Sequence, residues 1–307
     1  MKVLSKNMRP AISSDLERIA AIRSACWPAY PQTGADLRRN DAAFPRRQRF
    51  VFNDAGAVVA HAMIEPHEVE EGALLELDVQ PEFQSRGIGT AFYAELEPLL
   101  QGFTALTTRL PESHAFALHF AGARGFKEER RSWHQVLRPQ EFNPSGFAGL
   151  EVELVQRDYA IHAYPEIADE RKLYDLYTIT SRDVPGATEL PSFNEYQIRV
   201  LEHPMTQLEA YFIAVKDGEW VAYTGTRQRA TDRPLEWHTG MTGVLKAHRG
   251  RGLAVALKAH VIQLARKLGI AELHTNNDST NAEMLNVNRK LGYERESGVI
   301  QMKLERT

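Results

Sequence analysis

Two stretches of sequence decide the fold. The first, "PEFQSRGIGTAFYAEL", runs from Pro81 to Leu96, and the second, "KAHRGRGLAVALKAHV", runs from Lys246 to Val261, 165 positions later. Each follows an apolar run and passes through a charged, glycine-containing turn into a segment with an apolar helical face. A helix that begins directly after such a turn has unpaired backbone N–H groups, which favour a phosphate group.

The elements around these two stretches also repeat in the same order. Each half begins with a helical pattern, followed by two strand patterns around a tight turn: "RFVFNDAGAVVAHAMIE" in the first half and "AYFIAVKDGEWVAYTGTR" in the second. Each half continues with a strand, a helix and a closing glycine, Gly125 or Gly292, which lie 167 positions apart. This near-constant offset predicts two consecutive copies of one α/β module with a mixed sheet.

A boundary between the copies is expected in "RPQEFNPSGFAG", from Arg138 to Gly149, which holds two prolines and two glycines and has no sustained periodicity. We therefore predict an N-terminal module over residues 1–140, a linker over 141–149 and a C-terminal module over 150–307. Either module is long enough to bury a core of its own.

Composition excludes several classes of protein. Hydrophobic residues make up 43% of the chain and charged residues 25%, which is typical of globular proteins. The formal net charge of -3 gives no reason to expect nucleic acid as a partner, and no apolar run is long enough to span a membrane or form a signal peptide. We expect a cytoplasmic protein with no nucleic-acid or membrane partner.

The cysteine and histidine content argues against a metal site. The single cysteine, Cys26, excludes an internal disulfide and fits the apolar pattern of a helix, so we interpret it as a buried small residue. His114 and His119, the closest pair of histidines, are not spaced to put two ligands on one helix face. We expect no metal.

Both turns fit the pattern [QR]xxGx[GA], in "QSRGIG" (Gln84–Gly89) and "RGRGLA" (Arg249–Ala254). One such turn alone could be a tight strand-to-helix connection that binds nothing. The dinucleotide fingerprint GxGxxG is excluded because Val255 replaces its third glycine in the second copy, and Phe92 replaces it in the first.

These residues resemble a tandem protein of the GNAT superfamily, the Gcn5-related N-acetyltransferases, over essentially the whole chain. The resemblance implies a mixed, splayed sheet, acetyl-CoA as co-substrate, and a pyrophosphate loop at each motif. It implies that Val79 and Val244 give backbone hydrogen bonds to pantetheine. The implied cofactor-binding residues are Val79, Gln84, Arg86, Gly87, Ile88, Gly89 and Thr90 in the first module, and Val244, Arg249, Gly250, Arg251, Gly252, Leu253, Ala254, Asn281 and Asn288 in the second.

The helix after the last predicted strand holds two of these residues. Asn281 is expected to be its N-cap and Gly292 its C-cap, while Asn288 lies on the apolar face with Met284. A buried amide needs a partner, so Asn288 either satisfies a nearby backbone group or reaches the cofactor. The resemblance favours the cofactor.

Transfer to an amine needs a proton acceptor. On the strand before the second loop, Glu236 and His238 share the parity of Val244, so we predict them as candidate bases, provided that no bulge interrupts the strand. In the first module the same parity set is apolar, and Glu76 and Asp78 face the other way. Many family members carry a tyrosine that protonates the thiolate; Asn288 and Ala121 stand at that position, so no general acid is identified.

The predicted function is acetyl-CoA-dependent N-acetylation by direct attack on the thioester, with the second module catalytic and the first degenerate or regulatory. A non-catalytic acyl-CoA-binding or sensing protein, and two active modules with different acceptors, remain alternatives. Asp183, Glu189 and Glu195 lie in the segment expected to shape the acceptor pocket and favour a small cationic amine. Either a monomer or a homodimer is compatible with the sequence.

Overall fold

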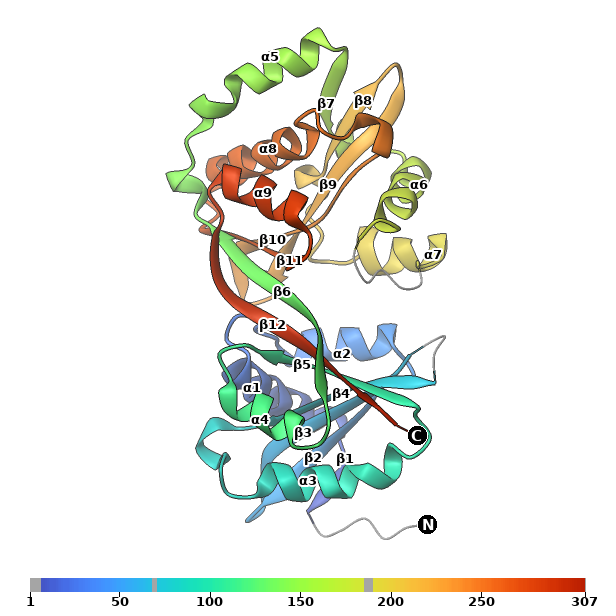
Figure 1. Ribbon diagram of the computed structural model, residues 1–307, viewed down its shortest axis with the longest axis vertical. Helices are drawn as coiled ribbons and strands as arrows, with labels where there is room; N and C mark the ends of the chain where they lie inside the picture. Colours follow the sequence, from blue (N-terminus) through green and yellow to red (C-terminus); the bar gives the residue numbers. More distant parts are fainter. Residues whose placement is uncertain (1–6, 68–70, 185–189, 307) are drawn as a thin grey trace. The chain divides into compact units, whose positions relative to one another are not determined.

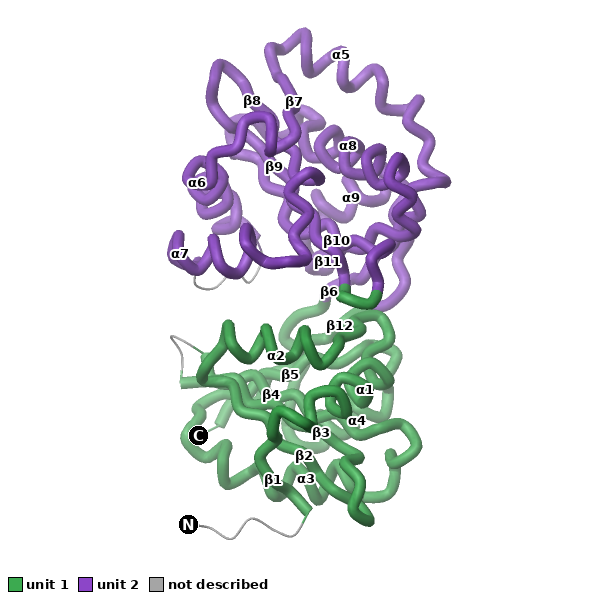
Figure 2. The backbone as a smooth tube through the Cα atoms, turned by 180° about the vertical axis from the view of Figure 1, so that it is seen from behind, with its two compact units in different colours: residues 1–131, 230–232, 298–307 green, residues 132–229, 233–297 purple. Residues whose placement is uncertain are grey.

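The structure is a computed structural model that describes residues 7–67, 71–184 and 190–306 (Figure 1). The chain forms two compact units (Figure 2): unit 1 comprises residues 1–131, 230–232 and 298–307, and unit 2 comprises residues 132–229 and 233–297. Among the described residues, no helix combines the length and the apolar character that crossing a bilayer requires.

Unit 1 is a mixed sheet with helices on both faces. Its strands follow the order β1-β2-β3-β4-β5-β12, with β4 and β5 parallel and the other pairs antiparallel. Its elements are β1 (Met8–Pro10), α1 (Leu16–Cys26), α2 (Gly34–Ala43), β2 (Gln48–Asp54), β3 (Ala57–Pro66), β4 (Gly72–Val79), α3 (Ile88–Leu96), β5 (Ala105–Pro111), α4 (Ala115–Gly122) and the last part of β12 (Glu294–Glu305).

Alternation along β4 separates two environments in unit 1. Leu75 and Leu77 pack in the core beneath α3 and α4. Glu76 and Asp78 point to the opposite face, where the guanidinium of Arg23 on α1 lies 2.6 Å and 2.9 Å from their carboxylates. The predicted parity of this strand is therefore confirmed, and its polar face is occupied by a buried ion-pair network.

Unit 2 repeats this arrangement with the order β6-β11-β10-β9-β8-β7. One core packs against α8, and a second, rich in tyrosines, packs beneath α6 and α7. Its elements are the last part of β6 (Lys127–Leu137), α5 (Ala148–Gln156), β7 (Tyr159–Ala163), α6 (Glu170–Ser181), α7 (Phe193–Tyr196), β8 (Phe212–Lys216), β9 (Glu219–Ala230), β10 (Arg233–Val244), α8 (Leu253–Lys267), β11 (Glu272–Asp278) and α9 (Ala282–Leu291).

The two tight hairpin turns occur where the sequence predicts them. Ala55 and Gly56 have φ values of 47° and 87°, and Asp217 and Gly218 have values of 53° and 81°. These left-handed conformations match the twist of the flanking strands and favour glycine and aspartate.

The units differ in outline from the modules expected from the sequence, because two strands are exchanged. The chain's last strand, β12, pairs with β5 in unit 1, from Val299 opposite Pro111 to Glu305 opposite Ala105. Strand β6, which follows α4 of the first copy, pairs with β11 in unit 2, from Leu137 opposite Leu273 to Ser132 opposite Asp278. Each sheet is completed by a strand from the other half of the sequence. The expected linker at 141–149 lies inside unit 2 and already contains the start of α5.

Candidate functional site: two loops and one open cavity

The two glycine turns have the same backbone conformation. Each passes through a 3-10 turn, at Pro81–Phe83 or Lys246–His248, and then through left-handed residues 165 positions apart. Ser85 and Gly250 have φ values of 60° and 73°, and Gly87 and Gly252 have values of 81° and 83°. Both loops therefore present the unpaired N–H groups of a helix start in the same way.

The first residue of each motif supports the turn. Gln84 Nε2 donates to the carbonyl oxygen of Val79 at 2.9 Å, and Arg249 Nε donates to that of Val244 at 3.0 Å. This shared bond explains the choice of glutamine or arginine, because either supplies an N–H donor at that reach. The family resemblance implies that Gln84 and Arg249 bind the pyrophosphate, whereas in the structure their donors bond to the end of the preceding strand.

The first loop opens into a cavity of about 450 Å³. Strands β4 and β5 pair only from Gly72–Leu74 to Ala105–Thr107 and then diverge, which leaves room between them. The cavity is lined by residues from β4, the loop, α3 and α4, among them Leu75, Val79, Gly87, Gly89, Thr90 and Phe120.

Most of the predicted first-module residues meet at this cavity, and two do not line it. Val79, Gln84, Gly87, Gly89 and Thr90 lie on its wall. Arg86 instead stacks over the ring of Phe83, 5.1 Å from its centroid, and the side chain of Ile88 is buried in the core.

The second loop is covered by α5 of the same unit. A Cβ placed on Gly252 would lie 2.5 Å from Cδ1 of Leu150, whereas a Cβ on Gly87 would meet no described atom within 4 Å. Arg251 donates to the hydroxyl of Tyr159 at 2.6 Å, and Arg249 forms an ion pair with Asp183. Leu253 is buried, and Ala254 is half-buried. Arg249, Arg251 and Gly252 thus contact their own unit, although the loop conformation matches the first. Gly250, in contrast, faces open space.

The predicted caps of helix α9 are confirmed. Asn281 Oδ1 accepts a hydrogen bond from the backbone N–H of Met284 at 3.1 Å, and Gly292 ends the helix with φ 89°. Asn288 is fully buried, and its Nδ2 donates to Gln135 Oε1 at 2.8 Å and to Asn277 Oδ1 at 2.7 Å. These partners are side-chain amides on β6 and β11, whereas the sequence led us to expect a backbone group or the cofactor. Among the described residues, Asn288 Oδ1 has no hydrogen-bond partner.

The parity argument for the candidate bases is wrong beyond Thr239, because β10 changes face. Trp237 packs against the α8 core, whereas Met241, four residues later, packs against the tyrosine-rich core. At Gly243 a Cβ would lie 2.3 Å from Thr180 Oγ1 on α6, while Val244 packs against the α8 core. Glu236 and His238, on the opposite face from Trp237, therefore do not share a face with Val244.

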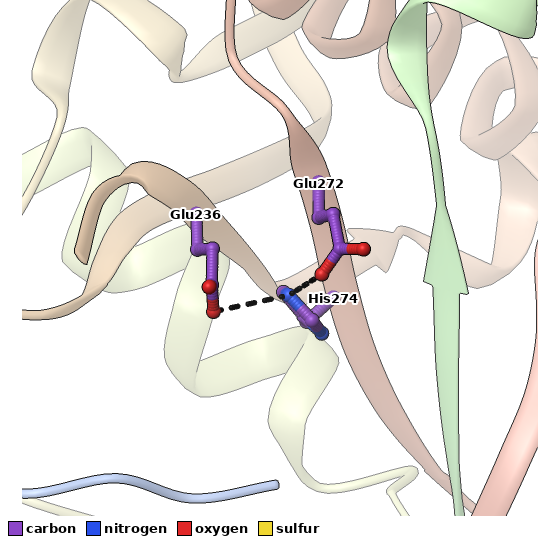
Figure 3. A group of neighbouring side chains, drawn as sticks. All are labelled: Glu236, Glu272 and His274. Carbon is purple, nitrogen blue, oxygen red and sulfur yellow. Dashed lines mark ion pairs between the residues drawn. The ribbon is translucent and has the colours of Figure 1, made fainter.

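Glu236 belongs to a cluster that its sequence neighbours do not reveal (Figure 3). Its carboxylate lies 3.6 Å from His274 Nε2, and the carboxylate of Glu272 lies 3.3 Å from the same nitrogen. These three groups could hold a metal ion by their spacing. Arg229 Nη1, however, lies 2.7 Å from Glu236 and 2.9 Å from His274 Nε2. The guanidinium supplies the positive charge that a metal would bring.

His238 has surroundings that keep it neutral. Its Nε2 lies 3.2 Å from the Asn276 amide nitrogen, and its Nδ1 is buried with no hydrogen-bond partner among the residues that the structure describes. Burial and the positive charge of Arg227 lower the pKa of His238 to about 3. If the Asn276 amide donates to Nε2, the proton lies on Nδ1, and the ring acts as a donor. Neither His238 nor the ion-paired Glu236 is a ready proton acceptor.

One further histidine, His134, extends this cluster, and sequence reasoning missed both it and His274. The rings of His134 and His274 stack with an interplanar angle of 6°, and His134 Nε2 lies 3.1 Å from His274 Nδ1. Burial lowers the pKa of His134 to about 4 and that of His274 to about 2. They come from β6 and β11, 140 residues apart, so only the strand pairing brings them together.

Cys26 matches its interpretation as a buried residue. Its Sγ lies 3.3 Å from the carbonyl oxygen of Val79, and burial raises the pKa of the thiol to about 12. A thiol with this pKa stays protonated and is not a nucleophile near neutral pH.

The fold and the paired loops define a protein built from two copies of one acyltransferase-like module. The model of the Acetyltransferase (GNAT) family matches residues 16–126 and 172–293, and the chain belongs to this family as a tandem member. A search of curated proteins found no significant sequence relative.

Solved structures share the tandem fold at low identity. A GCN5-related N-acetyltransferase from Sphaerobacter thermophilus is 17% identical, with a TM-score of 0.74 and coverage of 99% of this chain and 97% of the other. A tandem GNAT protein from the clavulanic acid biosynthesis pathway, solved without AcCoA, is 21% identical, with a TM-score of 0.71 and coverage of 97% and 98%. A GNAT-family acetyltransferase from Colwellia psychrerythraea is 13% identical, with a TM-score of 0.67 and coverage of 97% and 99%.

Proposed function

We propose that the protein is an acetyl-CoA-dependent N-acetyltransferase, and that the open cavity of unit 1 receives the cofactor. The cavity carries this proposal, because it lies between the diverging strands β4 and β5 and ends at the first glycine loop. Its apolar wall suits the pantetheine arm, and the N–H groups at the start of α3 suit the pyrophosphate. This location differs from the expectation that the second module is the active one.

The reaction requires a neutral amine to attack the thioester carbonyl; the carbon–sulfur bond then breaks, and the amine's proton passes to a base or water. His114 lines the cavity and offers an imidazole for this step. For a second active site in unit 2, Glu236 and His238 remain the proposed bases, although their surroundings favour neither. Exchanging each of His114, Glu236 and His238 for Gln locates the active unit: turnover should fall at least tenfold in the functional one.

The acceptor is proposed to be a small amine, with its charge left open. Asp183 is paired with Arg249 and Lys246, and Glu195 accepts the N-cap bonds of α7 at Ser192, so neither carboxylate is free for a cationic acceptor. Glu189, the third carboxylate, lies outside the described residues. Screening amines for release of the coenzyme A thiol would identify the acceptor.

The cofactor site is tested with a matched pair of substitutions. Gly89 has no positive φ, lines the cavity, and a Cβ there would make ordinary contacts of 3.5 Å with Phe120. Gly89→Glu therefore puts a carboxylate into the cavity without backbone strain, and should repel the cofactor and abolish binding in calorimetry. Ala254→Glu is the equivalent change in the second loop and should leave binding intact. If Ala254→Glu lost cofactor binding and Gly89→Glu kept it, the cofactor site would be assigned to unit 2.

A non-catalytic acyl-CoA-binding protein is the second candidate function. This candidate is favoured because the carboxylates of Glu76 and Asp78 are paired with Arg23 and lie on the face of β4 opposite the cavity. Neither carboxylate is therefore available as a base in the cavity. Trp27 adds to this network by donating to Asp78 at 3.0 Å. Tight acetyl-CoA binding with no turnover for any amine would establish this candidate.

A further inference from the structure

Arg124 lies on the wall of the unit 1 cavity, and its contacts hold the guanidinium in one place. Nη1 donates to the carbonyl oxygen of Phe120 at 3.0 Å, and Nη2 lies 3.4 Å from the hydroxyl of Thr90. The guanidinium carbon lies 3.4 Å from the ring centroid of Phe120 and 5.0 Å from that of Tyr93. The rings support the cation by stacking but do not neutralise it.

Arg124 also lacks an anionic partner among the described residues. Within the part of the chain that the structure describes, no carboxylate lies within ion-pair distance of it, in contrast to Arg23 of the same unit. A guanidinium has five N–H donors, and on Arg124 only two of them have acceptors in the described part of the chain. The remaining donors are available to an anion that enters from outside.

A second hollow begins where Arg124 stands. A groove of about 480 Å³ shares Thr90, Tyr93 and Arg124 with the cavity and continues along α3 past Ala94 and Glu97 to Arg306. The groove has two basic side chains, Arg124 and Arg306, and one acidic side chain, Glu97. An elongated ligand that filled both hollows would pass directly beside Arg124.

We propose that Arg124 binds a phosphate group of coenzyme A, and that the groove beyond it receives the nucleotide end of the molecule. This inference rests on the proposed function, because it needs the pantetheine arm in the adjoining cavity. Both the diphosphate and the 3′-phosphate could supply the anion, and the planar fork of arginine pairs with either.

Calorimetric titration of wild type and Arg124→Gln with three ligands tests the proposal. Coenzyme A should bind Arg124→Gln at least tenfold more weakly, since a charge-assisted contact is lost. Pantetheine, which has no phosphate, should bind both proteins equally. Dephospho-coenzyme A distinguishes the phosphates: it is weakened by the substitution if Arg124 binds the diphosphate, and unaffected if Arg124 binds the 3′-phosphate.

A matched control exists in unit 2. Arg171 also stacks over two rings, 5.5 Å from Tyr174 and 5.3 Å from Phe193, so Arg171→Gln removes a similar stacked arginine without touching the cavity. The Arg171→Gln variant should bind coenzyme A with the affinity of wild type. The Arg124→Lys variant should retain part of the wild-type affinity for coenzyme A.

Two results would overturn the assignment of Arg124: an unchanged affinity of Arg124→Gln for coenzyme A, or an equal loss for pantetheine, which would indicate a purely structural role. Failure of wild type to bind coenzyme A would overturn the proposed function as well.

Discussion

Gly87 and Gly252 show how one residue type in one conformation has two different surroundings. Both have left-handed φ values, which a residue with a Cβ adopts at a cost of about 1 kcal/mol. Gly87 faces open space, and Gly252 faces Leu150. The conformation follows from local sequence, whereas the neighbour depends on a helix about 100 residues away in the chain. The sequence could therefore predict both loops but not which of them is open.

Buried histidines predict how stability depends on pH. His61 is fully buried, and burial lowers its pKa to about 4. As the pH falls, the unfolded chain takes up the proton near pH 6.5, before the folded protein does. The contribution of His61 to the free energy of unfolding is therefore complete above pH 6.5 and is lost as the pH falls towards 4. The titration of His61 alone should lower the free energy of unfolding by about 1 kcal/mol as the pH falls from 6.5 to 5.5.

Urea denaturation at pH 7.0, 6.0 and 5.5 measures this loss. The variant His61→Gln should be less stable at every pH but should depend less on pH over this window. An identical slope in variant and wild type would show that His61 does not titrate as described.

At the scale of elements, helix α5 covers the second glycine loop. Leu150 projects from it against Gly252, and the neighbouring Phe142 and Phe147 rings stack at 5.3 Å. The sequence of this segment has the prolines and glycines of a linker, so its role as a cover was not predictable from composition. The change of face along β10 was equally hidden, because it depends on packing against α6 and α8.

Leu150→Ala should uncover the second loop. The substitution removes the atoms beside Gly252 at a cost of about 2 kcal/mol in stability. We expect acetyl-CoA titrations to change from one site per chain to two, with the second weaker. Val152→Ala, an exposed position on the same helix, is the control and should keep one site. One site in both variants would mean that the second loop does not bind the cofactor even when uncovered.

At the scale of the whole molecule, the exchanged strand β12 makes the N-terminal half depend on the C-terminus. Ile300 and Met302 of β12 are buried in the unit 1 core, and the backbone of β12 covers the edge of β5. The repeat of elements was predictable because each is specified by local periodicity. The pairing partners of β6 and β12 were not predictable, because the two copies end in equivalent strand patterns.

Ile300→Ala should therefore destabilise unit 1 by about 2–4 kcal/mol. Hydrogen exchange should show faster exchange in β4 and β5 and little change in β8 and β9. Val299→Ala, at a half-buried neighbouring position, should have a smaller effect. Faster exchange confined to unit 2 would contradict the assignment of β12 to unit 1.

The same strand bears on how the protein is made. During synthesis an N-terminal domain usually folds while the rest of the chain is still being translated. Here β5 is translated well before its neighbour β12, so the sheet of unit 1 has an open edge until β12 has been made. Because an uncovered edge favours pairing with other chains, a product truncated before β12 would be prone to aggregation, and loss of β12 would destabilise the sheet of unit 1.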